Sequence, residues 1–291
     1  MKKNIFILGL ALATTTAFAQ DLTSKKGENY LPEAGDIAIS FDAAPFLNYV
    51  GGFFSNAGGT APTGNYVGNL PWHIRGKYFA SETMAFRGGL RLNFGGDTYT
   101  AMVGQSGAAA PSFPAAPAMV EDVYKAGGSN IVLSGGVEMR RGKTRLQGYY
   151  GGELFIVSGG TKDTYTYGNA MSTTAAYPTT NFAFVGGNNL VNDPFYGLPG
   201  RVTESKTSSF GFGLRGFIGA EYFIFPKISL GLEYGWGLMM GSGKSTRSIE
   251  TQNGTAVGVV VDETATKSKS FGFDSDINYG TNGQLNIIFH F

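Results

Sequence analysis

Residues 228–238 read ISLGLEYGWGL, and an apolar side chain stands at every even-numbered position. The odd-numbered positions hold Ser229, Glu233 and three glycines. Successive side chains of a β-strand point to opposite faces, so this period of two predicts a strand with one apolar face and one small or polar face. The segment also has about the length that a tilted strand needs to cross a membrane.

The same period recurs along the chain. Eight segments show it, at residues 37–43, 72–80, 84–94, 131–139, 146–156, 210–222, 228–238 and 271–291. Short turns at 81–83, 141–144 and 224–227 alternate strictly with long stretches rich in Gly, Ser, Thr and Asn, at 44–70, 95–129, 158–206 and 241–268. We therefore predict an all-β fold, a membrane-spanning antiparallel up-and-down β-barrel of eight strands, with long extracellular loops and short periplasmic turns.

The composition excludes several other classes of protein. The chain has 45 glycines among 291 residues, 14% aromatic residues and 15% charged residues, which disfavours a disordered chain and a coiled coil. It has no cysteine, so it has neither disulfides nor a thiol nucleophile. With 22 basic and 21 acidic residues it lacks the basic surplus typical of nucleic-acid binding.

The N-terminal residues have the features of an export signal. Lys2 and Lys3 precede an apolar stretch, and Ala17-Phe18-Ala19 forms a cleavage site of the A-x-A type. We expect residues 1–19 to be a signal peptide and residues 20–291 to form a single outer-membrane β-barrel domain.

A soluble β-sandwich would show similar alternation, but its apolar faces would not be bordered by aromatic side chains. Rings near the ends of the apolar faces are typical of the interface between membrane and water. The predicted aromatic girdle comprises Trp72, Tyr78, Phe86, Phe94, Tyr150, Tyr222, Tyr234, Trp236 and Tyr279.

The opposite face carries charges of both signs. The phase of the strands assigns to the lumen the acids Asp36, Asp42, Glu138, Glu153, Glu221, Glu233, Asp274 and Asp276, and the bases Arg75, Lys77, Arg87, Arg91, Arg140, Arg145 and Arg215. The interior of an eight-stranded barrel is just wide enough for side chains to fill, and buried charges must pair. We expect an ion-paired plug; in the channel alternative, inward glycines such as Gly219 and Gly235 leave room for water.

The final segment, QLNIIFHF at 284–291, alternates and ends in phenylalanine. In this, and in its predicted architecture, the chain resembles the small eight-stranded outer-membrane barrels of the OmpA and OmpX type, in a Gly- and Tyr-rich style similar to that of Bacteroidetes barrels. The resemblance implies that Phe289 and Phe291 belong to the signal read by the barrel-assembly machinery during biogenesis. It also implies a bacterial outer-membrane location among lipid and lipopolysaccharide. An even number of strands places both termini in the periplasm.

Barrels of this size include anchors, adhesins, channels and enzymes, so the fold does not decide the function. The predicted loops carry large apolar side chains, among them Tyr165, Tyr167 and Phe195. We therefore predict a non-enzymatic scaffold, without cofactor or metal, that binds an outer-membrane protein complex or a surface ligand through its loops and outer wall. Two alternatives stay open: a narrow channel or OmpW-like carrier of small apolar ligands, and a lipid- or peptide-modifying enzyme. The enzyme would need a histidine such as His73 with a carboxylate or serine.

Overall fold

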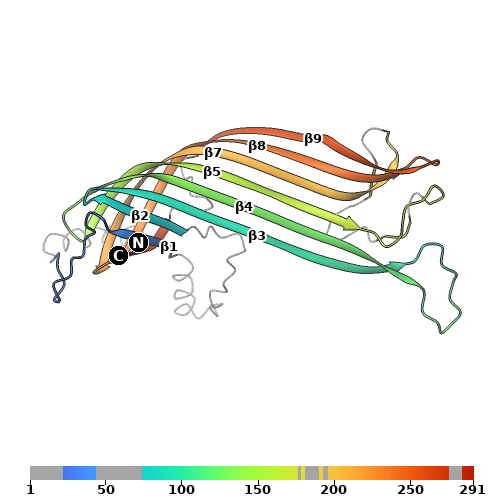
Figure 1. The fold of residues 1–291 in the computed structure, drawn as a ribbon, viewed down its shortest axis with the longest axis horizontal. Coiled ribbons are helices and arrows are strands. Elements are labelled where there is room, and N and C mark those ends of the chain that lie inside the picture. Colours follow the sequence, from blue (N-terminus) through green and yellow to red (C-terminus); the bar gives the residue numbers. More distant parts are fainter. Residues whose placement is uncertain (1–21, 44–73, 176–177, 181–189, 193–195, 275–283) are drawn as a thin grey trace, which may run out of the picture.

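The computed structural model describes residues 22–43, 74–175, 178–180, 190–192, 196–274 and 284–291, and this part of the chain is all-β (Figure 1). Its strands are β1 (Ile37–Asp42), β2 (Ile74–Ser81), β3 (Met84–Gly104), β4 (Met119–Arg141), β5 (Leu146–Thr166), β6 (Leu190–Asn192), β7 (Pro199–Phe225), β8 (Ile228–Gln252), β9 (Val257–Asp274) and β10 (Gln284–His290). Among the described residues, no helix is long and apolar enough to cross a membrane. The expected signal peptide lies outside them.

Eight strands form a closed ring of antiparallel neighbours. The order around the ring is β1-β2-β3-β4-β5-β7-β8-β10, and β10 pairs with β1 to close it. The closing register places Ala38 opposite His290 and Ile39 opposite Phe289. The all-β, antiparallel part of the prediction is therefore confirmed. The last predicted segment, 271–291, appears as the end of β9 and the whole of β10, which both pair with β8.

The ring is polar inside and apolar outside. On β8, Glu233 is 2% exposed, whereas its neighbours Leu232 and Tyr234 are 59% and 45% exposed. The same alternation of buried and exposed positions runs along the matching part of β3 and β7. A soluble sandwich would bury the apolar face and expose the polar one. The side chains that repeat with a period of two therefore place the apolar face of the sheet on the outside of the ring.

The strands are longer than the sequence predicts. β3, β4, β5, β7 and β8 span 21, 23, 21, 27 and 25 residues. Much of the predicted loops at 95–129, 158–206 and 241–268 is therefore strand, and that part of the prediction was wrong. These arms carry Gly, Ser, Thr and Lys on both faces, so hydropathy does not alternate along them, although backbone pairing continues without interruption in β3 and β4.

We call the part of the ring with apolar outward side chains the inner half, and the polar arms beyond it the outer half. The outer half comprises residues 95–104, 119–129, 158–166, 199–209, 241–252 and 257–270. There the sheet order is β3-β4-β5-β7-β8-β9, and within the described part of the chain β9 pairs with β8 alone. Figure 1 shows these arms sweeping away from the end where both chain termini lie.

The other end of the ring has tight connections. Two residues join β2 to β3 and β7 to β8, and residues 142–145 join β4 to β5, in agreement with the predicted short turns. The β7–β8 turn places Lys227 at a φ of 64°. The segment before β1 crosses this end, because Gly35 N–H donates to Phe79 O at 2.8 Å and Lys227 Nζ pairs with Asp36 Oδ2 at 2.6 Å.

Candidate functional site

Ion pairs fill the interior of the inner half. Nine charged side chains converge there from β2, β3, β4, β5, β7 and β8, and each is at most 6% exposed. They are the bases Arg75, Lys77, Arg87, Arg140 and Arg215 and the acids Glu138, Glu153, Glu221 and Glu233. All nine stand at positions that the sequence assigns to the lumen. The structure thus brings most of the predicted charge network together.

Glu233 is the centre of one cluster. Its carboxylate lies 3.2 Å from Arg75 Nη1, 2.9 Å from Arg87 Nη1 and 2.8 Å from Arg215 Nη1. Glu153 joins the same cluster at 2.9 Å from Arg215 Nη1 and 3.4 Å from Arg87 Nε. Two carboxylates shared among three guanidinium groups leave little local net charge, which is the condition for burying ions at all.

Glu221 organises a second cluster nearer the turns. It accepts from Arg140 Nη1 at 2.8 Å and lies 3.4 Å from Lys77 Nζ. Glu138 bridges to the same two bases, at 2.9 Å from Lys77 Nζ and 2.8 Å from Arg140 Nη1. His290 Nε2 lies 2.9 Å from Glu221 Oε1. The sequence predicts His290 at the periplasmic rim of the barrel; in the structure this residue lies between the outward Phe289 and Phe291 and is 3% exposed.

The contact of His290 with Glu221 and Ser229 is not a catalytic triad. The hydroxyl of Ser229 lies 3.2 Å from His290 Nε2, the same nitrogen that faces Glu221, and 2.5 Å from Glu221 itself. A triad requires the serine and the acid to bind different ring nitrogens. All three side chains are also buried. His73, the predicted candidate for an enzyme, lies outside the described residues.

Large side chains occupy the space above the inward glycines. A Cβ at Gly235 would overlap the Arg215 guanidinium, and a Cβ at Gly219 would overlap the Tyr149 ring. Lys77 Nζ lies over that tyrosine ring at 4.7 Å from its centroid. The space beside these two glycines is therefore filled by the side chains of Arg215 and Tyr149. The channel alternative expects water in that space.

The remaining predicted lumen residues lie elsewhere. Asp36 pairs with Lys227 at the turn end, and Arg145 lies over the Tyr30 ring at 3.6 Å, so neither belongs to the interior clusters. Arg91 is half-buried on the inward face of β3. The side chains of Asp42, Asp274 and Asp276 lie outside the described residues.

The predicted aromatic girdle points outward wherever it is described. Its exposed members are Tyr78, Phe86, Phe94, Tyr150, Tyr222, Tyr234 and Trp236, while Trp72 and Tyr279 lie outside the described residues. The two phenylalanines of the predicted assembly signal, Phe289 and Phe291, are 37% and 69% exposed. These rings therefore form an exposed aromatic surface on the outer side of the ring.

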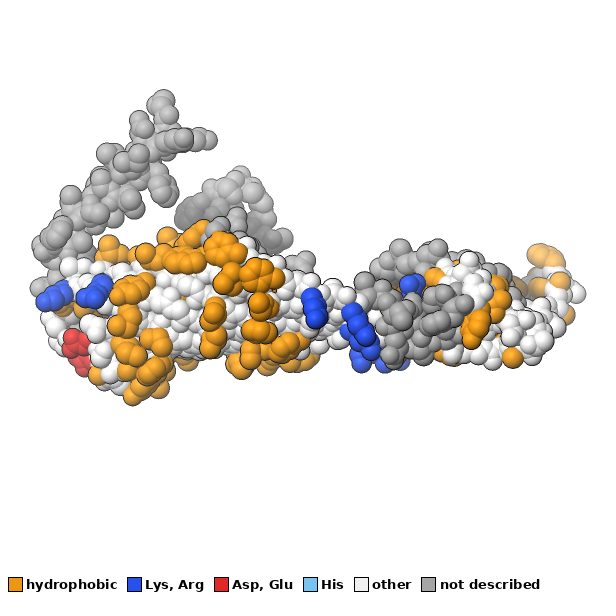
Figure 2. Space-filling model, turned by 90° about the horizontal axis from the view of Figure 1, so that it is seen from above, with side chains coloured by type: hydrophobic (Ala, Val, Ile, Leu, Met, Phe, Trp, Pro, Cys, Tyr) orange, Lys and Arg blue, Asp and Glu red, His pale blue; other side chains and the backbone are white. Residues whose placement is uncertain are grey.

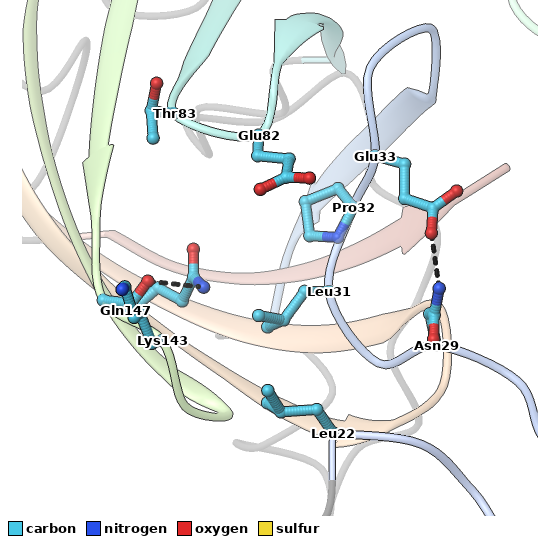
Figure 3. A pocket seen from close by; sticks show the side chains of 10 residues that line it. Leu22, Asn29, Leu31, Pro32, Glu33, Glu82, Thr83, Lys143 and Gln147 are labelled. Carbon is cyan, nitrogen blue, oxygen red and sulfur yellow. Dashed lines mark hydrogen bonds between the residues drawn. The ribbon is translucent and has the colours of Figure 1, made fainter.

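A pocket of about 370 Å³ lies between the N-terminal segment and the turns (Figure 3). Leu22, Leu31 and Pro32 line its apolar side, and the exposed Glu82 and Lys143 lie at its rim. Its wall also connects to the interior, because Gln147 accepts from Arg140 Nε at 3.3 Å. The pocket therefore lies where the N-terminal segment packs against the turns that close this end of the ring.

A row of stacked tyrosines crosses the inward face of the outer half. The Tyr99 and Tyr124 ring centroids are 5.8 Å apart, those of Tyr124 and Tyr165 are 4.8 Å apart, and those of Tyr165 and Tyr167 are 6.4 Å apart. The Tyr124 hydroxyl donates to Asp163 Oδ1 at 3.0 Å. Burial and the nearby Asp163 carboxylate raise the pKa of Tyr124. The row joins β3, β4 and β5 through stacked rings on their inward face.

The segment after β5 folds onto the tips of the arms. Asp122 Oδ1 accepts from Gly168 N–H and its Oδ2 accepts from the Thr180 hydroxyl, both at 2.8 Å. Asn169 Nδ2 donates to Gly104 O at 2.9 Å. Arg201 lies over the Tyr167 ring at 4.1 Å. Hydrogen bonds therefore join the described residues at the far end of the outer half, which we call the tip.

No protein-family model matches the chain, and no curated protein matches it. In the described residues, three or more His, Cys, Asp or Glu side chains are nowhere grouped in a way that could hold a metal ion.

Proposed function

We propose that the chain is an outer-membrane β-barrel with a closed lumen, which acts without catalysis as a scaffold and presents its outer half as a binding surface outside the cell. The observation that carries this proposal is the combination of an ion-paired interior with an exposed apolar outer wall. Its inner half would lie in the membrane, and both termini would face the periplasm.

The height of the apolar wall supports a membrane location. On β7 the outward apolar side chains run from Phe210 to Tyr222, and both are exposed. That distance is about 40 Å along the strand, or about 30 Å along the ring axis at a tilt of about 40°. The hydrocarbon core of a bilayer is about 30 Å thick. Near the turn end the described strands pair all the way round the ring, as backbone groups in lipid must.

The interior clusters support a closed lumen. A conducting pore would keep its charges hydrated, whereas Glu221, Arg140 and Arg215 are at most 1% exposed. Each contacts at least one opposite charge. Opening a path would require several ion pairs to separate together, at a cost of several kcal/mol for each uncompensated ion.

The tip of the outer half supports a role in binding. Phe113 in the β3–β4 connection is 99% exposed, Met102 near the end of β3 is 59% exposed, and Tyr196 before β7 is 74% exposed. Aromatic and methionine side chains are enriched in interfaces.

Planar lipid bilayers test the closed lumen. We expect the refolded mature protein to insert without steady single-channel current. Arg215→Ala/Glu233→Ala removes two members of the central cluster and should produce intermittent conductance. Arg201→Ala/Glu250→Ala removes an ion pair of 2.8 Å in the tip and should stay silent. Steady current through the unmodified protein would replace the proposal with the channel reading.

A further inference from the structure

Phe113 forms an uncharged knob at the tip of the β3–β4 hairpin. Its side chain is 99% exposed, so it gains almost nothing from packing within its own chain. Residues 98–120 around it contain no charged side chain. Figure 2 shows that hydrophobic side chains appear again at the far end of the arms, past a stretch in which polar and basic ones dominate. The tip therefore presents an apolar ring that a second surface could bury.

The β8–β9 hairpin carries a groove that such a ring would fit. The groove has a volume of about 220 Å³, and none of its lining residues is charged. They are Tyr196, Leu198, Thr251, Asn253, Ala256, Val257, Gly258 and Val259. Asn253 Oδ1 accepts from Ala256 N–H at 2.9 Å and holds the turn in shape. An apolar cavity of about 150 Å³ accepts benzene, so the groove has room for one phenyl ring.

The knob and the groove lie at opposite margins of the outer half. The sheet order β3-β4-β5-β7-β8-β9 separates the two hairpins, as Figure 1 shows. They also stand at about the same height, because β3 ends at Gly104, ten residues beyond Phe94, and β8 ends at Gln252, twelve residues beyond Met240. Two copies that stand parallel in one membrane would therefore bring the knob of one to the groove of the next.

The size of this contact decides where it can act. One aromatic side chain buries about 150–250 Å², whereas a stable interface in solution buries at least about 1,200 Å². A single knob in a single groove would thus not hold two copies together in detergent. In a membrane, the copies share one orientation and move in two dimensions, which raises their effective concentration.

We propose that copies of the chain associate side by side in the membrane, with Phe113 of each copy inserted between Leu198 and Val259 of the next. The inference rests on the proposed membrane location, and it names a second copy as a partner of the proposed scaffold. Because neither surface carries charge, the two tips meet without like-charge repulsion. The contact joins two different patches, so it is heterologous and repeats from copy to copy into rows or rings.

Fluorescence energy transfer between copies in lipid vesicles tests the proposal. The chain has no cysteine, so Lys25→Cys at the turn end gives one labelling site for a donor or an acceptor dye. We expect transfer above the level calculated for randomly placed copies, and none in detergent. Phe113→Ser and Val259→Lys should each lower transfer in vesicles to the random level. The matched control, Thr255→Lys, puts the same charge on the same hairpin outside the groove and should leave transfer unchanged.

A mixture of the two variants gives the sharpest result. Phe113→Ser removes the knob and keeps the groove, whereas Val259→Lys blocks the groove and keeps the knob. With the donor on one variant and the acceptor on the other, transfer should return, although each variant alone shows none. If the mixture stayed at the random level, or if Phe113→Ser alone kept full transfer, the knob and groove would not be the contact.

Two further measurements separate the remaining outcomes. Transfer between two vesicle populations that each carry one dye would overturn the side-by-side arrangement and assign the contact to opposing membranes. Resistance to added protease reports insertion of each variant. Failure of the unmodified protein to insert would reject the membrane location itself, whereas insertion with transfer at the random level would reject only the association.

Discussion

The two halves of the same strands solve opposite problems. In the inner half, Leu214 is 57% exposed while Arg215 is 1% exposed. In the outer half, Lys206 and its β5 partner Lys162 face outward, and the inward face carries a tyrosine row in place of ion pairs. Among the described residues, β10 and β1 close the ring near the turns, whereas the outer half is a sheet in the order β3-β4-β5-β7-β8-β9.

The difference shows how the requirements on side chains and on backbone hydrogen bonds change between an apolar and an aqueous surrounding. In the proposed orientation the inner half lies in lipid, where outward side chains must be apolar and backbone groups must be paired, and its inward charges and paired strands meet both requirements. In water, hydration satisfies side chains and sheet edges, so both faces can be polar and the hairpin arms hold together by backbone pairing and stacked tyrosines.

The largest effect should come from a buried acid. Glu233→Ala removes the carboxylate that contacts Arg75, Arg87 and Arg215 and leaves buried positive charge without compensation. We expect a loss of about 3–5 kcal/mol in the free energy of unfolding. Glu204→Ala in the outer half removes an exposed partner of Lys162 and should cost about 0.2–1 kcal/mol.

Urea unfolding in micelles, followed by tryptophan fluorescence, measures both values. Equal losses for the two variants would mean that the interior clusters are hydrated, and the contrast between a dry inner half and a wet outer half would fail.

A second substitution examines the outer wall. Leu214→Arg places a charge in the middle of the apolar wall of β7, where a lipid surrounding makes it cost about 2–4 kcal/mol. Thr100→Arg places the same side chain on the exposed, outward face of the β3 arm and should cost close to nothing. The yield of folded protein in vesicles, read from the gel-mobility shift on heating, compares the two.

The smallest effect concerns the turn end. Burial raises the pKa of Asp36, but Lys227 and the Glu33 N–H outweigh it and hold the pKa below the ordinary value of 3.8. The contact therefore stabilises the N-terminal segment above pH 3.8 and weakens as the pH falls through the lower folded value. The protection factors of the amides of residues 22–36, which correct for the pH dependence of intrinsic exchange, should fall on acidification over that range. Asp36→Asn should give low protection factors at every pH, and a variant that still showed the acid step would assign the step to another group.

The sequence predicts the inner half well because hydropathy alternates there. Glu233 and Arg215 were placed inside by their phase alone. The prediction of loops for the outer half was wrong because Gly, Ser, Thr and Lys occur on both faces of its strands. Hydropathy therefore does not alternate there, as residues 241–252 show. His290 alternates with two outward phenylalanines, so phase could have placed it inside. The contact between Gly235 and the Arg215 guanidinium depends on the register of β7 against β8. The alternation of apolar and polar residues does not predict that register.

The arms also have a reach. Pro199–Ser209 adds a stretch of about 36 Å to β7 beyond its last outward apolar side chain. In the proposed orientation, a molecule held at the hairpin tips would stand clear of the sugars on neighbouring lipids. Crowding by surface polysaccharide, rather than access to the bilayer, would then select which molecules arrive.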